Sequence, residues 1–199
     1  SSKYFSNIAQ NQMTLEMEMP TVAEKKTVMK IHNFSAGPAI LPSSVIEQAA
    51  AGVLNFNGTG LSVLEMSHRS KDIVAVADEA TALVKELIGL TDEYEVVWMS
   101  GGASTQFVLA AMNLLDNDKM AAYVDTGTWA AKSIEAARDF GTINVIASSK
   151  STTYDHIPKG WVVPEGAEYL HITSNNTIYG TQYQWTPETD KPIVCDMSS

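Results

Sequence analysis

The chain has 199 residues, of which 45% are hydrophobic and 18% are charged, an ordinary composition for a globular domain with one sizeable core. Its formal net charge of −10 disfavours nucleic acid and anionic membrane as partners. No apolar run approaches the roughly 20 residues of a transmembrane helix, and the single cysteine excludes an internal disulfide, so we expect a reducing cytoplasm.

Residues 1–28 are rich in Ser, Asn, Gln, Thr and Met and show no clear periodicity. Their positive and negative side chains cancel, so the whole excess of negative charge lies in residues 29–199. We expect residues 1–28 to be poorly ordered and to be either an extension or residues added for expression. The native chain is expected to start at Met29.

The stretch FSAGPAILP (34–42) predicts a stiff turn with few side-chain atoms. Gly37 can adopt a positive φ, and Pro38 fixes its own φ and disfavours a helical residue before it. A helix is expected next, over SSVIEQAAAGVLNF (43–56), with Ser43 or Ser44 as its N-cap. A second helix is expected over residues 70–90, ended by Gly89. Its apolar face is predicted to contain Ile73, Val76, Ala80, Leu83, Val84 and Leu87.

Short apolar runs alternate with helical patterns through the rest of the chain, which predicts an α/β fold with a parallel, doubly wound sheet. Strands are expected at YEVVWM (94–99), MAAYVD (120–125), INVIAS (143–148), EYLHITS (168–174) and KPIVCD (191–196). Helices are expected at STQFVLAAMNLL (104–115) and TGTWAAKSIEAARDFG (126–141). Ligands of such sheets bind at the carboxyl ends of the strands, so the residues that follow each strand are the candidates for a site.

The stretch GGAS, residues 101–104, follows the first expected strand and begins a helix. Glycines leave backbone N–H groups open at this helix N-terminus, where the partial positive charge favours a phosphate. The alternative is an ordinary strand-to-helix turn that Ser104 caps. The stretch is neither a P-loop, since the Lys-Ser/Thr ending is missing, nor a GxGxxG fingerprint.

Three further side chains are expected at the same edge of the sheet. Trp129 lies off the buried stripe of its helix, which Ala130, Ile134 and Ala137 form, so its ring either stacks on a flat ligand or lies half-buried under a loop. Thr173 ends its strand and either touches a ligand or caps its own turn. Asp196 directly follows PIVC and either accepts from a protonated ring nitrogen or binds loop N–H groups.

The stretch MSHRS places His68 and Arg69 just before the second helix. Arginine suits bidentate binding of a carboxylate or a phosphate. The alternative is a solvated pair at a helix start, although a cation there opposes the helix dipole. His32, His156 and His171 have no metal-ligand spacing, and no metal site is expected. Cys195 is expected to be buried in its strand.

In this order and spacing, HNFSAGPAILP, MSHRS, GGAS, TGTW, HITSNNTIYGTQ and CDMSS resemble the motifs of the phosphoserine aminotransferases, class-V enzymes of pyridoxal-phosphate fold type I. The resemblance runs from Lys30 to Ser199. It implies a large cofactor domain, pyridoxal 5'-phosphate (PLP) as cofactor and a cytoplasmic homodimer. It also implies transfer of an amino group from L-glutamate to 3-phosphohydroxypyruvate in serine biosynthesis. The alternatives are a desulfurase or decarboxylase of the same fold, and a nucleotide-binding or structural α/β module.

The resemblance also implies roles for single residues. The backbone around Ala103 and Ser104 would hold the cofactor phosphate, and Trp129 would stack on the pyridine ring. Thr173 would touch the polar substituents of the ring. Asp196 would pair with the ring nitrogen and keep it protonated, so that the ring can act as an electron sink.

Substrate contacts are implied in two earlier segments. Arg69 would bind a substrate carboxylate, and His68 would lie near the substrate phosphate. One alternative is that these contacts are made across a dimer interface. The loop that contains Ser35 and Gly37 would line the mouth of the substrate site, because its small residues let the backbone approach the substrate.

One departure from the family pattern concerns the Schiff-base lysine, which follows the ring-nitrogen aspartate in the family. Only Met197, Ser198 and Ser199 follow Asp196 here, and no lysine stands in a matching position. The resemblance therefore implies that residues 29–199 are the amino-terminal part of the PLP-binding large domain. We expect these residues alone to lack transaminase activity and to associate with a carboxy-terminal portion that completes the enzyme.

Overall fold

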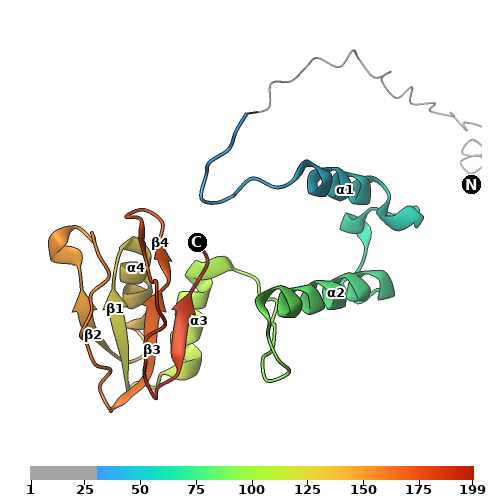
Figure 1. Cartoon of the computed structure of the whole chain (residues 1–199). Coiled ribbons are helices and arrows are strands. Elements are labelled where there is room, and N and C mark those ends of the chain that lie inside the picture. Colours follow the sequence, from blue (N-terminus) through green and yellow to red (C-terminus); the bar gives the residue numbers. More distant parts are fainter. Residues whose placement is uncertain (1–30) are drawn as a thin grey trace, which may run out of the picture. The chain divides into compact units, whose positions relative to one another are not determined.

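A computed structural model describes residues 31–199, which are coloured in Figure 1. The chain divides after Phe34 into two units, and the second, Ser35–Ser199, contains every helix and strand of the described residues. The expectation of a poorly ordered extension at residues 1–28 lies outside the described residues.

Helices α1 (Ser43–Leu54) and α2 (Lys71–Ile88) form where the sequence predicts them. Helix α2 ends at Gly89, whose left-handed φ of 72° confirms the predicted helix stop. The N-cap of α1 is Pro42, so the prediction of a serine cap is wrong. Two short 3-10 helices, Phe56–Gly58 and Val63–Glu65, lie between α1 and α2 in the chain.

The apolar face predicted for α2 is largely exposed in the part of the chain that the structure describes. Val76, Leu83 and Leu87 are 46%, 47% and 83% exposed, and neither α1 nor α2 contains a buried residue. The periodicity is real, but burial requires a surface to pack against, and residues 31–199 leave these faces half-buried at most.

The turn predicted before α1 does not use the freedom of Gly37 to adopt a positive φ, because Gly37 is not among the glycines of residues 31–199 that have one. The peptide bond between Gly37 and Pro38 is cis. The segment around it is exposed.

Four parallel strands form the central sheet in the order β2-β1-β3-β6. They are β1 (Met120–Asp125), β2 (Thr142–Ser148), β3 (Ala167–Thr173) and β6 (Ile193–Asp196). All four follow the sequence prediction, since each is an apolar run bounded by polar or turn residues. Helices alternate with the strands of this parallel sheet, which confirms the α/β class, but within residues 31–199 helices pack on one face only, so the doubly wound arrangement is not seen there.

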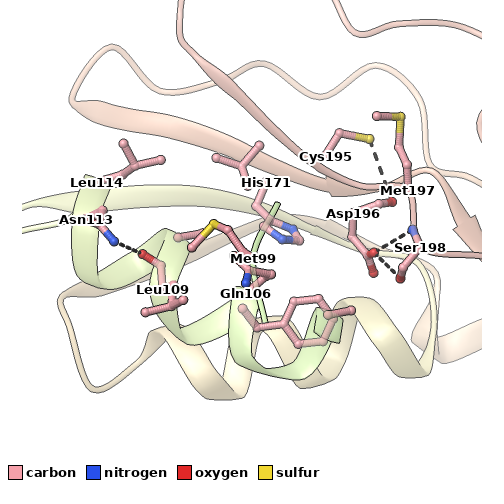
Figure 2. Close-up of a pocket in the computed structure, with 14 residues that line it drawn as sticks. Met99, Gln106, Leu109, Asn113, Leu114, His171, Cys195, Asp196, Met197 and Ser198 are labelled. Carbon is pink, nitrogen blue, oxygen red and sulfur yellow. Dashed lines mark hydrogen bonds between the residues drawn. The ribbon is translucent and has the colours of Figure 1, made fainter. Parts of the chain in front are cut away.

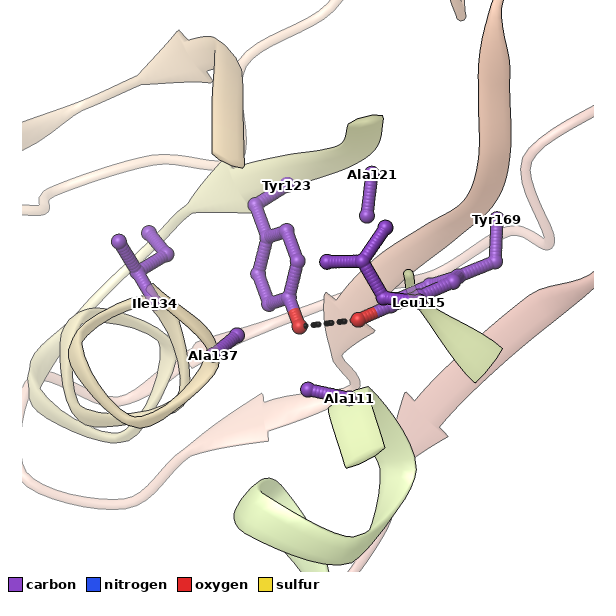
Figure 3. Packing of buried hydrophobic residues seen from close by; sticks show 7 residues of the cluster. All are labelled: Ala111, Leu115, Ala121, Tyr123, Ile134, Ala137 and Tyr169. Carbon is purple, nitrogen blue, oxygen red and sulfur yellow. Dashed lines mark hydrogen bonds between the residues drawn. The ribbon is translucent and has the colours of Figure 1, made fainter. Parts of the chain in front are cut away.

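Helices α3 (Gly102–Leu114) and α4 (Thr128–Ala137) cover one face of the sheet and pack against each other. Figure 3 shows this core, in which side chains of both helices meet Tyr123 of β1 and Tyr169 of β3. The tyrosine hydroxyls lie 2.8 Å apart and hydrogen-bond to each other. The other face is covered within the described residues by non-helical segments that contain Trp161, Val163 and Tyr183.

The predicted strand at residues 94–99 is wrong. The segment is irregular, and Val97, Trp98 and Met99 are 71%, 61% and 60% exposed. Trp98 donates from Nε1 to the hydroxyl of Thr81 at 2.9 Å. An apolar run becomes a strand only when another strand pairs with its backbone, and no strand in residues 31–199 does so.

A small antiparallel hairpin of β4 (Asn175–Asn176) and β5 (Thr181–Gln182) follows β3. The strands expected from the sequence do not include these residues. The buried side chains of Asn176 and Thr181 point to tertiary contacts that composition alone does not reveal.

Candidate functional site

The carboxyl ends of β3 and β6 lie side by side. Thr173 pairs in register with Asp196, so the last residues of the two strands meet at one edge of the sheet. The backbone N–H and the hydroxyl of Ser174 both donate to the carbonyl oxygen of Asp196, at 2.9 and 3.1 Å. This edge is where ligands of parallel sheets bind, as the sequence analysis expected.

A cavity of about 570 Å³ opens at this edge (Figure 2). Its lining includes Ala103, Gln106 and Phe107 from α3, together with His171 from β3 and Asp196 from β6. Two predicted site residues, Ala103 and Asp196, therefore share one cavity. Ser104, Trp129 and Thr173 are not among its lining residues in the described structure.

The amino end of α3 presents a bare backbone. Its N-cap is Gly101, with a φ of 100°, and a Cβ there would lie 2.6 Å from the hydroxyl oxygen of Thr105. No side chain of the described residues caps this helix, so the alternative in which Ser104 caps the turn is wrong. The first N–H groups of a helix have no intrahelical acceptor, and this end is suited to an anion.

The carboxylate of Asp196 is half-buried and held by the residues that follow it. Oδ1 accepts hydrogen bonds from the backbone N–H of Ser198 at 3.1 Å and from its hydroxyl at 2.6 Å (Figure 2). The described structure gives Oδ2 no hydrogen-bond donor. Asp196 thus binds a loop N–H with one oxygen, and the other oxygen is available to a ligand, so both sequence readings are compatible with the geometry.

His171 lines the same cavity, and sequence reasoning did not assign it a role. Its side chain is 3% exposed, stacks on Tyr123 with the ring centroids 4.7 Å apart, and has Nδ1 3.5 Å from the hydroxyl of Ser133. Burial lowers the pKa of His171 to about 4, although the nearby Asp196 carboxylate acts in the opposite direction. The alternation of side chains along a strand could have identified His171 as a site residue. Residues two apart on a strand share a face, and His171 lies two residues before Thr173.

Trp129 lies in the first turn of α4 and is half-buried. The ammonium of Lys132 lies 4.7 Å from the centroid of the Trp129 rings, a cation–π contact between residues three apart. The indole Nε1 is buried and has no acceptor within the described residues. The position off the buried stripe is confirmed, whereas stacking on a ligand stays a prediction.

Two threonine hydroxyls are candidates for a contact with a ligand at this edge. That of Thr173 is buried and lacks a partner among the described residues, and the residue is only 1% exposed. That of Thr177, which sequence reasoning did not single out, belongs to a half-buried residue and donates to the hydroxyl of Ser199. Thr177 thereby reaches the segment that follows Asp196.

The predicted substrate residues are exposed. His68 and Arg69 precede α2, whose N-cap is Ser70, and the backbone N–H of Arg69 donates to the hydroxyl of Ser67 at 3.2 Å. Ser35 and Gly37 lie before α1. The roles of these residues stay predictions.

Cys195 of β6 is half-buried rather than fully buried, and burial raises the pKa of its thiol. Residues 31–199 contain no cluster of three or more His, Cys, Asp and Glu side chains that could hold a metal ion. No helix within these residues is long and apolar enough to cross a bilayer.

Comparison with known proteins finds relatives that are aminotransferases. The family model described as aminotransferase class-V matches residues 31–192. The phosphoserine aminotransferase of Flavobacterium johnsoniae is 55% identical over 172 residues, which are 86% of this chain and 48% of that protein. The corresponding protein of Nitrosomonas europaea is 44% identical over 180 residues, covering 85% of this chain and 49% of its own length.

Solved structures show the same likeness. Phosphoserine aminotransferase from Bacillus circulans subsp. alkalophilus matches with a TM-score of 0.82 and 43% identity, covering 85% of this chain and 48% of that one. The PLP-bound enzyme from Trichomonas vaginalis matches with a TM-score of 0.80 and 34% identity, covering 85% and 51%. The chain thus spans about half the length of these relatives. Since the family model matches most of the chain, this protein belongs to the class-V aminotransferase family.

Proposed function

We propose that the full-length protein is a phosphoserine aminotransferase of serine biosynthesis. It transfers the amino group of L-glutamate to 3-phosphohydroxypyruvate, giving O-phospho-L-serine and 2-oxoglutarate. The observation that carries this proposal is the 55% identity to the Flavobacterium johnsoniae phosphoserine aminotransferase over 86% of this chain. Residues 29–199 then belong to the PLP-binding large domain of a cytoplasmic homodimer.

Two of the groups that line the cavity beside α3 and β6 suit PLP, while most of the remaining wall is apolar. Ala103, in the uncapped first turn of α3, and the Asp196 carboxylate line the same space of about 570 Å³. The backbone N–H groups around Ala103 and Ser104 would hold the phosphate. Asp196 would keep a proton on the ring nitrogen. When bound, PLP supplies an electron sink through which an amino group can move between two carbonyl compounds.

The imidazole of His171 is uncharged and therefore leaves the negative charge of Asp196 in place. With its pKa lowered to about 4, the imidazole is uncharged near pH 7 and does not neutralise the carboxylate. The negative charge of Asp196 is thus available to a cationic partner in the cavity. Trp129 would stack on one side of the pyridine ring.

Substrate binding is assigned to the exposed segments before α1 and α2. The guanidinium of Arg69 would bind a substrate carboxylate with two parallel hydrogen bonds. His68 would bind near the substrate phosphate. Backbone groups of the loop that contains Ser35 and Gly37 would line the mouth of the site.

The proposed substrate can be tested with the full-length protein. Purified enzyme is supplied with L-glutamate and either 3-phosphohydroxypyruvate or an unphosphorylated keto acid, and 2-oxoglutarate is measured. We expect kcat/KM to favour the phosphorylated acid by roughly a hundredfold or more, because a site built for a polar group rejects an analogue that lacks it. A preference for the unphosphorylated acid would contradict the proposal.

The role of Asp196 is tested by Asp196→Asn in the full-length protein. The amide has nearly the same shape but lacks the charge that favours a protonated ring nitrogen, so we expect kcat to fall roughly a hundredfold or more with folding retained. Asp139→Asn, at an exposed position after α4, is the matched control and should leave kcat unchanged. Turnover of Asp196→Asn near that of wild type would refute the ring-nitrogen assignment.

The contact between a threonine hydroxyl and PLP is tested by comparing Thr173→Val with Thr177→Val. Each change removes one hydroxyl at nearly constant volume. Because Thr177 is half-buried and Thr173 is 1% exposed, we expect Thr177→Val to raise the Kd for PLP more, by roughly fivefold for one hydrogen bond. A larger effect of Thr173→Val would instead assign the contact to Thr173, as expected from the sequence.

A further inference from the structure

The side chain of Asn176 joins the β4–β5 hairpin to the start of α4. Its Nδ2 donates to the hydroxyl of Thr126 at 2.8 Å, and its Oδ1 accepts from the backbone N–H of Ala130 at 3.4 Å. Asn176 itself is 0% exposed. The N-cap of α4 is Gly127, which has no side chain, so the carboxamide of Asn176 performs the capping from another element.

The turn at Gly127 is shaped to admit this carboxamide. Gly127 has a φ of 156°, and a Cβ there would lie 2.5 Å from Oδ1 of Asn176. The hydroxyl of Thr181 also donates to the carbonyl oxygen of Thr126 at 2.9 Å, and the N–H of Gly180 donates to the carbonyl oxygen of Asn176 at 2.8 Å. The hairpin is closed on itself and tied to residues 126–130 from two of its positions.

The two sides of this connection carry candidate cofactor contacts. Trp129 immediately precedes Ala130, whose N–H is held by Asn176, and Thr177 immediately follows Asn176. A shift of the carboxamide would therefore change the position of the indole relative to the threonine hydroxyl. Reacting and binding groups held about 1 Å out of place can cost roughly a hundredfold in rate.

We propose that Asn176 is a positioning residue, whose carboxamide sets the orientation of Trp129 relative to the loop that contains Thr177. The inference rests on the proposed function only in assigning cofactor contacts to Trp129 and Thr177. The coupling between Asn176 and Trp129 is a property of the chain itself.

Asparagine suits this position because it supplies a donor and an acceptor on one short side chain. Leucine of similar size leaves the hydroxyl of Thr126 and the N–H of Ala130 buried without their partner. Aspartate keeps an acceptor for the N–H, and the hydroxyl of Thr126 can rotate to donate to its second oxygen. Its negative charge also lies at the favourable end of α4. Asn176→Asp is therefore the conservative variant.

The first test measures the coupling without cofactor. The full-length protein without PLP is labelled with 5-fluorotryptophan, and the fluorine resonance of Trp129 is identified by its loss in Trp129→Phe. We expect Asn176→Leu to shift or broaden this resonance and Asn176→Asp to restore it. The exposed Asn117→Leu is the control and should leave it unchanged. An unchanged Trp129 resonance in folded Asn176→Leu would overturn the proposal.

A second variant covers the case in which Asn176→Leu does not fold. Thr181→Val removes one hydrogen bond to the carbonyl oxygen of Thr126 and leaves the carboxamide in place. We expect a smaller displacement of the same Trp129 resonance. If Thr181→Val leaves that resonance at its wild-type position and width, the hairpin does not position Trp129 and the proposal is overturned.

The second test uses the full-length protein with PLP. Because a positioning residue acts on each bound cofactor, we expect Asn176→Leu to lower kcat per bound PLP roughly tenfold to a hundredfold. The KM for glutamate should stay within about twofold of wild type, and Asn176→Asp should recover most of kcat. Equal kcat per bound PLP in wild type and Asn176→Leu would overturn the proposal. Failure of the wild type to bind PLP would instead refute the proposed function, and the fluorine experiment would still decide the coupling.

Discussion

Helices α2 and α4 both have an apolar stripe at helical spacing, yet they differ in burial. On α4, Ala130, Ile134 and Ala137 are 1%, 6% and 0% exposed, because they pack on the parallel sheet. On α2, Leu83 and Leu87 are 47% and 83% exposed. The comparison teaches that periodicity is sufficient to predict a helix and its apolar face, whereas stabilisation by burial depends on the surface that meets that face.

The largest expected effect comes from truncating one leucine in the sheet and one leucine on α2 to alanine. Leu170 of β3 is 0% exposed, and Leu170→Ala in the 199-residue chain should lower the free energy of unfolding by roughly 2–5 kcal/mol. Leu87→Ala on α2 should change it by less than about 0.5 kcal/mol, because that side chain is 83% exposed. Urea unfolding followed by circular dichroism measures both. Equal losses would mean that α2 is buried as deeply as the sheet.

The next effect concerns acid and the buried imidazole of His171. Its pKa is lowered from 6.5 to about 4 in the folded chain, so the unfolded chain binds more protons between these values. Stability should therefore be unaffected by His171 above about pH 6.5 and fall as the pH drops toward 4. The total loss is roughly 3 kcal/mol at about 1.4 kcal/mol per pKa unit.

The measurement is the free energy of unfolding in urea at several pH values between 4 and 7.5. We expect its decline with acid to be shallower in His171→Gln than in wild type. Asn117→Leu is the control, because Asn117 is exposed and has no titratable side chain, and it should keep the wild-type slope. Identical slopes for wild type and His171→Gln would show that the imidazole titrates normally.

A smaller effect is expected at the tyrosine pair of the core. Burial raises the pKa of both phenols, so Tyr123 and Tyr169 stay protonated and share one hydrogen bond of 2.8 Å. Tyr169→Phe leaves the hydroxyl of Tyr123 buried without its partner, which should cost about 1–3 kcal/mol. Tyr94→Phe removes a hydroxyl from a side chain that is 55% exposed and should be nearly neutral. If both changes cost the same, the hydrogen bond in the core contributes nothing measurable.

The smallest effect is kinetic and concerns Cys195. Burial raises the pKa of its thiol, which lowers the fraction of reactive thiolate at neutral pH. We expect the folded chain to react with a disulfide reagent at least roughly tenfold more slowly than the urea-unfolded chain. The absorbance of the released thiol reports the rate. Equal rates in the folded and unfolded chains would place Cys195 in solvent.

The missed features share one cause, which is that their partners are distant in sequence. Asn176 reaches Thr126, 50 residues earlier, and His171 meets Ser133, 38 residues earlier. No local pattern marks either contact. The error at residues 94–99 has the same origin, since a strand needs a neighbour to pair with its backbone, and that neighbour cannot be read from the apolar run itself.

The order of helices and strands from β1 onward, the end of α2 at Gly89 and the buried stripe of α4 could all be predicted from the amino-acid sequence, and so could the family, from its motifs. These depend on the local backbone preference of glycine and on the regular spacing of apolar side chains. Three features of the site became visible in the folded chain alone. Ala103 and Asp196 share a cavity, His171 lies beside them with a lowered pKa, and Asn176 caps α4. Those results depend on which strands pair and which faces meet, because burial and hydrogen bonding act between segments that the chain brings together only on folding.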